Sequence, residues 1–304
     1  MSPHTVRPAT PADHQDIADV IAAVFPYLLT SPASLAHWLE TSTGDSPALF
    51  AAEEEGRVVG SCFVSFSPMS STPGAVGMQL AVLSGHRRRG IGSALLARAE
   101  EHHATIGGST LSSHSGDDDG LDFAVKRGFA AGRTGRISRA LLAGIPDAAP
   151  VPAGIEVRPL AEVEDWRAVY ETDALALVDI PGTTPLVPPP YERWREEILA
   201  DPRMDVASSV VALDGKTVAA LAYLYRVGGR VYSNFTGTHP EYRGKGLAML
   251  VKSHGLHTAR RAGVTEAFTI NDAENTAMLA VNTKLGYEGF AVQRAVKRAA
   301  RSEL

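Results

Sequence analysis

The chain of 304 residues is poor in cysteine and has no long apolar run. Its one cysteine, Cys62, excludes an internal disulfide, and the strand-like run around it predicts a small buried side chain. No run approaches the roughly 18 apolar residues of a membrane-spanning helix. No basic segment followed by an apolar one opens the chain, as it would in a secretory signal. We therefore expect a cytoplasmic protein with no membrane partner.

The chain also lacks a large excess of either positive or negative charge. The chain has 29 Lys and Arg against 34 Asp and Glu, which gives a net charge of −5. Neither half carries the broad positive field of a nucleic-acid binder. The metal-binding patterns H-E-x-x-H and C-x-x-C do not occur, and neither does the G-x-S-x-G of many serine hydrolases. We expect no nucleic-acid partner and no metal.

The chain has enough apolar residues, 44%, to build two cores. Three prolines and two glycines fall within residues 142–154 and mark a linker. Three short motifs also occur once on each side of it, in the same order and at a nearly constant offset. They are Val-Arg-Pro from residues 6 and 157, an Arg/Gly loop at 87–92 and 243–248, and Gly with an aromatic residue from 128 and 286. We predict one fold used twice, with domains at 1–142 and 155–304 and a linker at 143–154.

Each half has a similar pattern of elements. In the second half, strand patterns cover residues 155–158, 208–213, 217–225, 230–238, 265–270 and 287–296, and helix patterns cover 162–176, 191–199, 246–262 and 274–285. Asp214-Gly215 predicts a hairpin turn, as Glu55-Gly56 does in the first half. A strand at 75–82, a helix at 91–105 and a strand at 110–113 match in the first half. This order predicts the α/β (mixed α+β) class, with a mixed sheet flanked by helices in each domain.

The Arg/Gly loop is the element that carries chemistry. It lies between a strand and a helix, where the first N–H groups of the helix have no internal partner and the helix dipole is positive. Glycine lets an anion approach the backbone, and Arg243 and Lys245 add full positive charge. The loop is neither a P-loop nor a dinucleotide-binding G-x-G-x-x-G. It predicts a diphosphate site.

The pattern R-x-x-G-x-G/A at such a turn resembles the acetyl-CoA loop of the GNAT acetyltransferase superfamily. The helix that starts at Asn275 and ends at Gly286-Tyr287 resembles that family's second signature. The resemblance extends over nearly the whole chain and is weaker in the first half. It implies that acetyl-CoA binds to the strand before the loop, to the loop, and beside the next helix, at Phe235, Thr236, Thr238, Arg243, Gly244, Lys245, Gly246, Leu247, Ala248 and Asn275.

The resemblance also implies direct attack of an amine on the acetyl thioester, but the expected catalytic groups differ. Asn282 stands where the family often has a proton-donating tyrosine, and an amide is no general acid. The strand before the loop has no carboxylate to act as base. Tyr232 and Ser233 on that strand are weak substitutes, and Asp173 and Asp179 on the preceding helix and loop are others. Asp179 could instead bind the substrate ammonium or simply shape its turn.

The first half departs further from the family. Its loop is intact and forms a possible second cofactor site, at Arg87, Arg88, Arg89, Gly90, Ile91 and Gly92. However, Asp117–Asp119 stand where the second half has Asn275, and carboxylates would oppose a diphosphate, although they could also cap a helix. Ala124 replaces Asn282. We predict that this domain is catalytically silent.

These observations favour an N-acetyltransferase acting on a small-molecule amine, as a monomer or homodimer. The missing catalytic groups are also compatible with a non-catalytic acyl-CoA sensor. The width of the acyl pocket cannot be read from the residues, so another acyl group, or a hydroxyl acceptor, is equally allowed.

Overall fold

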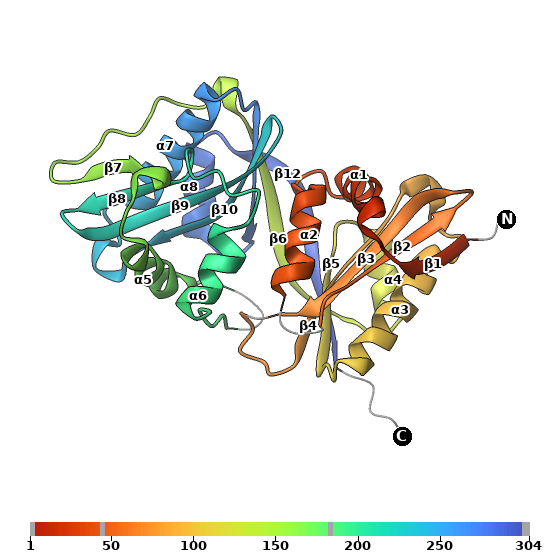
Figure 1. Cartoon of the computed structure of the whole chain (residues 1–304). Coiled ribbons are helices and arrows are strands. Elements are labelled where there is room, and N and C mark those ends of the chain that lie inside the picture. Colours follow the sequence, from red (N-terminus) through yellow and green to blue (C-terminus); the bar gives the residue numbers. More distant parts are fainter. Residues whose placement is uncertain (1–3, 43–45, 68, 182–184, 300–304) are drawn as a thin grey trace. The chain divides into compact units, whose positions relative to one another are not determined.

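The computed structural model describes residues 4–42, 46–67, 69–181 and 185–299 (Figure 1). They form two compact units, of which unit 1 is Met1–Arg133 with Gln293–Leu304 and unit 2 is Thr134–Val292. Each unit is a mixed sheet with helices, and the predicted α/β class is therefore confirmed. No helix in the described ranges is long and apolar enough to cross a membrane.

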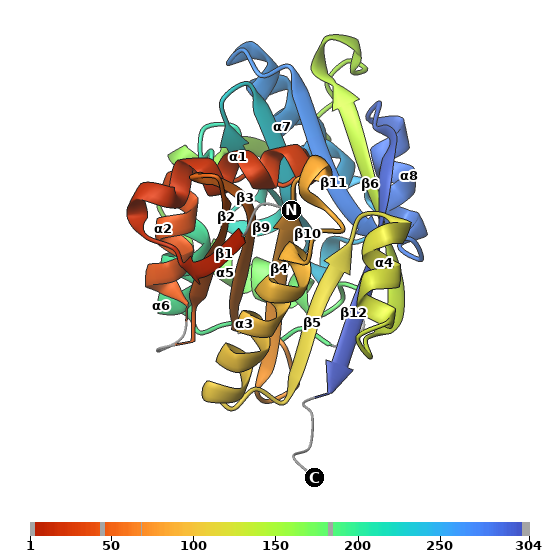
Figure 2. The same ribbon diagram turned by 90° about the vertical axis from the view of Figure 1, so that its right-hand side faces the viewer.

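Unit 1 has the strand order β1-β2-β3-β4-β5-β12, in which only β4 and β5 are parallel. Its strands are β1 (His4–Pro8), β2 (Ala48–Glu54), β3 (Arg57–Phe66), β4 (Ala75–Val82), β5 (Thr110–Ser115) and the end of β12 (Glu288–Ala299). Its helices are α1 (His14–Val24), α2 (Pro32–Thr41), α3 (Ile91–Thr105) and α4 (Asp118–Val125). Figure 2 shows β5 and β12 side by side.

Unit 2 has the order β6-β11-β10-β9-β8-β7, in which only β10 and β11 are parallel. Its strands are β6 (Ala130–Leu141), β7 (Glu156–Pro159), β8 (Val210–Asp214), β9 (Thr217–Val227), β10 (Arg230–Thr238) and β11 (Glu266–Asp272). Its helices are α5 (Trp166–Leu177), α6 (Tyr191–Trp194), α7 (Leu247–Arg261) and α8 (Thr276–Lys284). A π-helical turn, Arg195–Leu199, continues α6.

Each unit includes a strand from the other half of the sequence. β6, the last strand of the first half, pairs with β11 in unit 2, whereas β12, the last strand of the second half, pairs with β5 in unit 1. The unit boundaries therefore fall within these two strands, after Arg133 and after Val292, and not in the segment 143–154. The repeat motifs mark the copies along the chain, but they do not say which sheet a terminal strand joins.

The sheet of unit 2 buries a different helix on each face. Alternate side chains along a strand point to opposite faces. On β8 and β9, Ala212 and Ala222 pack in one cluster with Leu250 of α7. Their neighbours Val211 and Tyr223 belong to another cluster with residues of α5 and α6. Figure 1 shows α5 and α7 on the two sides of this sheet.

Local sequence explains several of these elements. Both predicted hairpin turns form, and Gly56 and Gly215 have positive φ angles of 75° and 59°, which glycine adopts without strain. Asp117 accepts a hydrogen bond from the backbone of Gly120 at 2.7 Å and caps α4, as its position predicted. Cys62 is fully buried in β3, which confirms its expected role as a small core residue.

Candidate functional site

The parallel strands β10 and β11 separate part of the way along their length. They are paired only over Arg230–Tyr232 and Glu266–Phe268, although β10 runs on to Thr238. Against β9, the register of β10 shifts between Ser233 and Phe235, which marks a bulge. A bulge and a lost ladder leave backbone N–H and C=O groups unpaired at the strand edges. This is a suitable place for an extended ligand with amide groups.

The Arg/Gly loop of unit 2 follows the end of β10 and starts α7. Gly244 and Gly246 have φ angles of 75° and 78°, and Gly246 is the N-cap of α7 with no side-chain cap. A Cβ atom added at either glycine would meet nothing within 4 Å. The turn before α7 is therefore uncrowded at both glycines, and no N-cap side chain occupies the start of the helix, where N–H groups lack internal partners. Lys245 lies beside this space, with its amine 4.6 Å from the centre of the Tyr242 ring.

The structure places Asp179 at this loop. Its carboxylate accepts a hydrogen bond from Arg243, and both side chains are about half exposed. Asp179 follows α5 in the chain, so the ion pair links the segment after that helix to the anion loop. The carboxylate occupies a donor that a bound phosphate would use. This position fits a competitor of the anion better than a base for an acceptor amine.

Four of the other predicted residues lie on β10, on both sides of the bulge. Tyr232 is partly exposed, in the stretch paired with both β9 and β11. Phe235 follows the bulge and packs against Tyr223 of β9, with 5.9 Å between ring centres. Thr236 and Thr238 continue the strand and pair with β9. The strand therefore presents backbone and apolar groups rather than an acid or base.

Asn275 and Asn282 have separate roles on α8. Asn275 is the N-cap, and its side-chain oxygen accepts from the backbone N–H of Met278 at 3.1 Å. Asn282, six residues into the helix, is 2% exposed. Its Oδ1 accepts from the Nζ of Lys252 at 2.6 Å, and its Nδ2 donates to Oδ1 of Asn271 at 2.6 Å. The Asn282 amide is thus held by two buried or partly buried partners.

Asp173 is a buried carboxylate on the helix that packs against β10. It lies on α5, is 7% exposed, and accepts a hydrogen bond from the indole N–H of Trp194 at 2.6 Å. Burial raises its pKa to about 6 although this hydrogen bond works in the opposite direction. Burial, with the negative charge of Asp173, also raises the pKa of Tyr223. A carboxyl group with a pKa this close to neutrality is suited to accept a proton.

The location of Asp173 follows from the packing of α5 on the sheet. A Cβ atom added to Gly237 of β10 would lie 2.8 Å from Ala176, so α5 approaches β10 within van der Waals contact. Asp173 is one turn earlier in the same helix, and Tyr223 of β9 lies opposite Phe235 at the bulge. Asp173 was only one of several candidates by sequence. The available signal was a charged residue on the buried stripe of α5 between Val169 and Ala176.

The corresponding loop of unit 1 is occupied by its own carboxylates. Arg87 donates to Asp117 at 2.6 Å, Arg88 pairs with Asp119, and Arg89 lies 3.2 Å from Glu54. Glu54 is buried, and its hydrogen bond with His86, supported by Arg89, lowers the pKa of its carboxyl group. Burial raises the pKa of Asp117, but the hydrogen bonds from Arg87 and the Gly120 backbone, together with the charge of Arg87, lower that pKa overall. All three arginines of the loop thus have an anionic partner.

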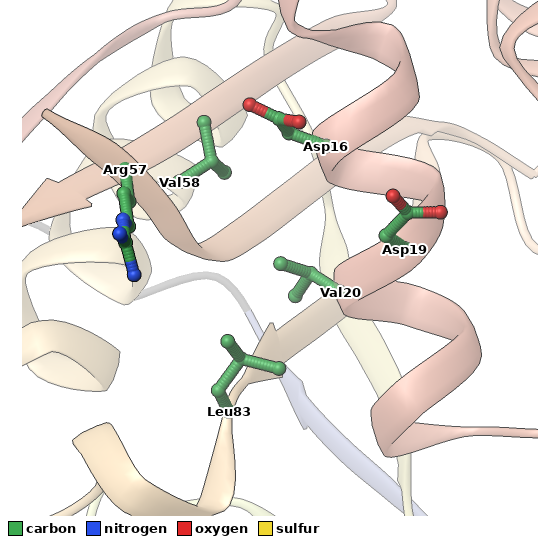
Figure 3. Close-up of a pocket in the computed structure, with 6 residues that line it drawn as sticks. All are labelled: Asp16, Asp19, Val20, Arg57, Val58 and Leu83. Carbon is green, nitrogen blue, oxygen red and sulfur yellow. The ribbon is translucent and has the colours of Figure 1, made fainter.

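A pocket of about 400 Å³ in unit 1 lies apart from this loop. Figure 3 shows Asp16, Asp19 and Val20 of α1 on one side and Arg57 and Val58 of β3 on the other, with Leu83 nearby. None of the loop residues 87–92 lines it. The loop at residues 87–92 and this pocket are therefore separate features.

Comparison with known proteins gives a family match in each half of the chain. Residues 15–129 match the "Acetyltransferase (GNAT) family" and residues 157–270 match the "Acetyltransferase (GNAT) domain". The mycothiol acetyltransferase of Geodermatophilus obscurus is 28% identical over 239 residues, 73% of either chain. That of Actinosynnema mirum is 25% identical over 241 residues, 78% of either chain.

Two solved structures have the same fold at 19% identity. A GCN5-related N-acetyltransferase from Sphaerobacter thermophilus has a TM-score of 0.75 and covers all of this chain and 98% of its own. A tandem GNAT protein from the clavulanic acid biosynthesis pathway has a TM-score of 0.73, with 99% and 100% covered. The sequence matches extend over most of both halves of the chain. This chain therefore belongs to the GNAT family of N-acetyltransferases and carries two of its domains in tandem.

Proposed function

We propose that unit 2 binds acetyl-CoA and transfers its acetyl group to the amine of a small molecule by direct attack. The observation that carries this proposal is the separation of β10 from β11 next to an open anion loop. In the reaction, a nitrogen–carbon bond forms, the carbon–sulfur bond of the thioester breaks, and coenzyme A leaves as the thiolate, which then takes up a proton from solvent. The amine loses one proton, which the enzyme must accept.

The residues of unit 2 fit the parts of acetyl-CoA. The backbone N–H groups of Gly244–Ala248, with Arg243 and Lys245, would hold the diphosphate. The edge of β10 from Phe235 to Thr238 would pair with the amides of the pantetheine arm, and Asn275 lies at the start of the adjacent helix. The bound cofactor supplies an activated acetyl group. Residues of this protein must bind and orient the two substrates and accept the proton of the amine.

Asp173 is the base that we infer for the acceptor amine. It faces the side of the sheet opposite α7, so the acceptor would reach the bulge from the α5 face while the cofactor occupies the loop. A carboxylate with a pKa of about 6 is mostly ionised at neutral pH and can take the proton directly or through water. Tyr232 lies on the same strand as the bulge but has no base character near neutral pH.

Departure of the thiolate needs less assistance from the protein than deprotonation of the amine. A thiol has an ordinary pKa of about 8.5, so its thiolate is a tolerable leaving group near neutral pH. Asn282 cannot donate a proton in this range, and both sides of its amide are already engaged. We infer that the thiolate leaves without a protein acid.

We propose that unit 1 is catalytically silent. A diphosphate bound at its loop would have to displace the carboxylates of Asp117, Asp119 and Glu54 from the arginines. Each displaced carboxylate would then stand near the anion and repel it. The first half of the chain contributes the strand β6 to the sheet of unit 2, which gives it a structural role without turnover.

The acceptor is a small amine because the near-neutral halves of the chain carry no large field for a polymer. The relatives are named for mycothiol, so its deacetylated form belongs among the amines to be tried. The test is release of free thiol from acetyl-CoA in the presence of purified protein and a panel of amines. Acetyl-CoA binding without thiol release for any amine supports a non-catalytic acyl-CoA sensor. Faster release with longer acyl-CoA donors supports transfer of a larger acyl group, and release with alcohols supports a hydroxyl acceptor.

Matched variants test which unit is active. Arg243→Ala together with Gly246→Val removes one cation and fills the open turn at a positive φ angle, and should abolish thiol release. The corresponding changes Arg87→Ala and Gly90→Val should leave most of it. Greater damage from the second pair would reverse the assignment.

A further inference from the structure

Lys252 is a buried lysine in the middle of α7. Its side chain on α7 is 1% exposed, donates one hydrogen bond, to Asn282, and lies with Nζ 4.9 Å from the ring centre of Tyr287. Within the described residues it has no ion pair with a carboxylate. Burial without such a partner lowers its pKa to about 7. The sixth residue after the loop glycine is Lys252 in unit 2 and Leu96 in unit 1, where it is a buried core residue.

The hydrogen bonds that start at Lys252 have a fixed direction. An ammonium group can only donate, so Asn282 must turn its oxygen to Lys252 and its nitrogen to Asn271. Asn271 must then accept with its oxygen, which leaves its Nδ2 group as the free end. That Nδ2 group donates to no other residue that the structure describes, and Asn271 is partly exposed. Lys252 thereby determines which atom of Asn271 is presented to a ligand.

Asn271 lies where the two strands have separated. Its strand, β11, is paired with β10 only up to Phe268, so Asn271 follows the last ladder pair. Two further polar groups are buried nearby, the hydroxyls of Ser233 at the bulge and of Tyr287 beside Lys252. They lie close to each other, but neither has a hydrogen bond of good geometry within the described ranges. A cluster of buried polar groups, some without partners, marks a place where a ligand completes the hydrogen bonding.

We propose that Lys252 is a positioning residue for acetyl-CoA: through Asn282 it turns the side-chain N–H of Asn271 toward a carbonyl oxygen of the pantetheine arm between β10 and β11. The proposal rests on the proposed function, because it assumes that acetyl-CoA binds there. Unit 1 lacks all three residues of this hydrogen-bonded series, and has Leu96, Ala124 and Ser115 at the places of Lys252, Asn282 and Asn271. The difference agrees with a role in cofactor binding in unit 2 alone.

The test is a double-mutant cycle on acetyl-CoA affinity, measured by calorimetry with the full chain at pH 6.5, where Lys252 is mainly charged. Asn271→Ala removes the donor and Lys252→Met removes the group that orients it while keeping the length of the side chain. A neutral hydrogen bond contributes about 1 kcal/mol, so each single variant should weaken binding about 5-fold. Both substitutions remove the same hydrogen bond, from Asn271 to acetyl-CoA. The double variant should therefore bind acetyl-CoA no more weakly than the single variant with the lower affinity.

Three outcomes separate the possibilities. Multiplied losses in the double variant, about 25-fold, would mean that Lys252 acts independently of Asn271 and overturn the positioning role. Unchanged affinity of the Lys252→Met variant for acetyl-CoA would also overturn the positioning role. A wild-type protein that does not bind acetyl-CoA would instead overturn the proposed function itself. Leu96→Met is the matched control in unit 1 and should leave affinity unchanged. Thermal unfolding of each variant confirms that it is folded, and Lys252→Met should be no less stable than the wild type.

Discussion

Replacing Asp173 by asparagine removes a charge that unit 2 has to bury, without changing the shape of the side chain. The asparagine oxygen can still accept from the indole N–H of Trp194, which lies 2.6 Å from the carboxylate in the wild type. The substitution therefore isolates the effect of charge. We expect the variant to be more stable than the wild type and nearly inactive.

The stability gain follows from the raised pKa. The pKa of Asp173 is about 6 in the folded state and 3.8 in an ordinary environment, so the unfolded state releases its proton first as pH rises. The Asp173 carboxyl group therefore does not destabilise the folded state in acid, where it is protonated in both states. Between pH 3.8 and 6 it ionises in the unfolded state but not in the folded state, and the free energy of unfolding falls. At about 1.4 kcal/mol per pKa unit, the penalty in the wild type is about 1 kcal/mol at pH 4.5 and about 3 kcal/mol at pH 7.5. Asparagine carries no such penalty at either pH.

Hydrogen exchange of the amides of β9 measures this difference in unit 2 alone. The free energy of opening should be higher in the asparagine variant, and its advantage should grow by about 2 kcal/mol from pH 4.5 to pH 7.5. An equal difference at both pH values would refute the reasoning, because it would mean that the charge of Asp173 is not penalised. Turnover should fall by about 100-fold or more, as expected for loss of a base. A stabilised variant with full turnover would leave the energetics intact and remove Asp173 from the mechanism.

Two further substitutions and one labelling experiment should give distinct results. Trp194→Phe removes the hydrogen bond that lowers the pKa of Asp173, so the acid limb of the pH–rate profile should move to higher pH, and a downward shift would contradict the base assignment. Asp179→Asn frees Arg243, and because an exposed ion pair contributes less than about 1 kcal/mol, calorimetry should show acetyl-CoA binding up to a few-fold tighter with stability almost unchanged. Cys62 is buried and its pKa is raised by desolvation, so an aromatic disulfide reagent should label it only after urea unfolds unit 1, and labelling of the native protein would show that β3 opens.

Features that depend on neighbouring residues could be predicted from the sequence. The turn at Asp214-Gly215 and the glycine at the start of α7 need only a backbone that tolerates positive φ angles, and both are found where the sequence placed them. The anion loop follows because its Arg, Gly and helix start are consecutive. The cap at Asp117 is equally local. In each case the physical cause lies within a few residues of its effect.

Features that depend on distant contacts could not be predicted in the same way. The exchange of β6 and β12 changes no local pattern, because each strand has the same alternation whichever sheet it joins. The contact of Asp173 with Trp194 joins two helices separated by a loop, and no spacing rule relates them. Lys252 reads as an ordinary surface residue of a helix until the fold buries it.

Asp173 and Lys252 together indicate where the sheet of unit 2 is adapted to function rather than stability. They carry opposite charge, but they lie on opposite faces, in contact with α5-side and α7-side residues respectively, so neither can neutralise the other. A buried charge without an ionic partner destabilises a fold, and selection for stability alone would replace it by an apolar residue. Unit 1 has made that replacement at one position, with Leu96 in place of Lys252, and has also closed its anion loop with carboxylates. The unit with these unfavourable charges is also the one whose loop has an ion pair at Arg243 alone among its residues 243–248, and this agrees with the proposal that unit 2 performs acetyl transfer.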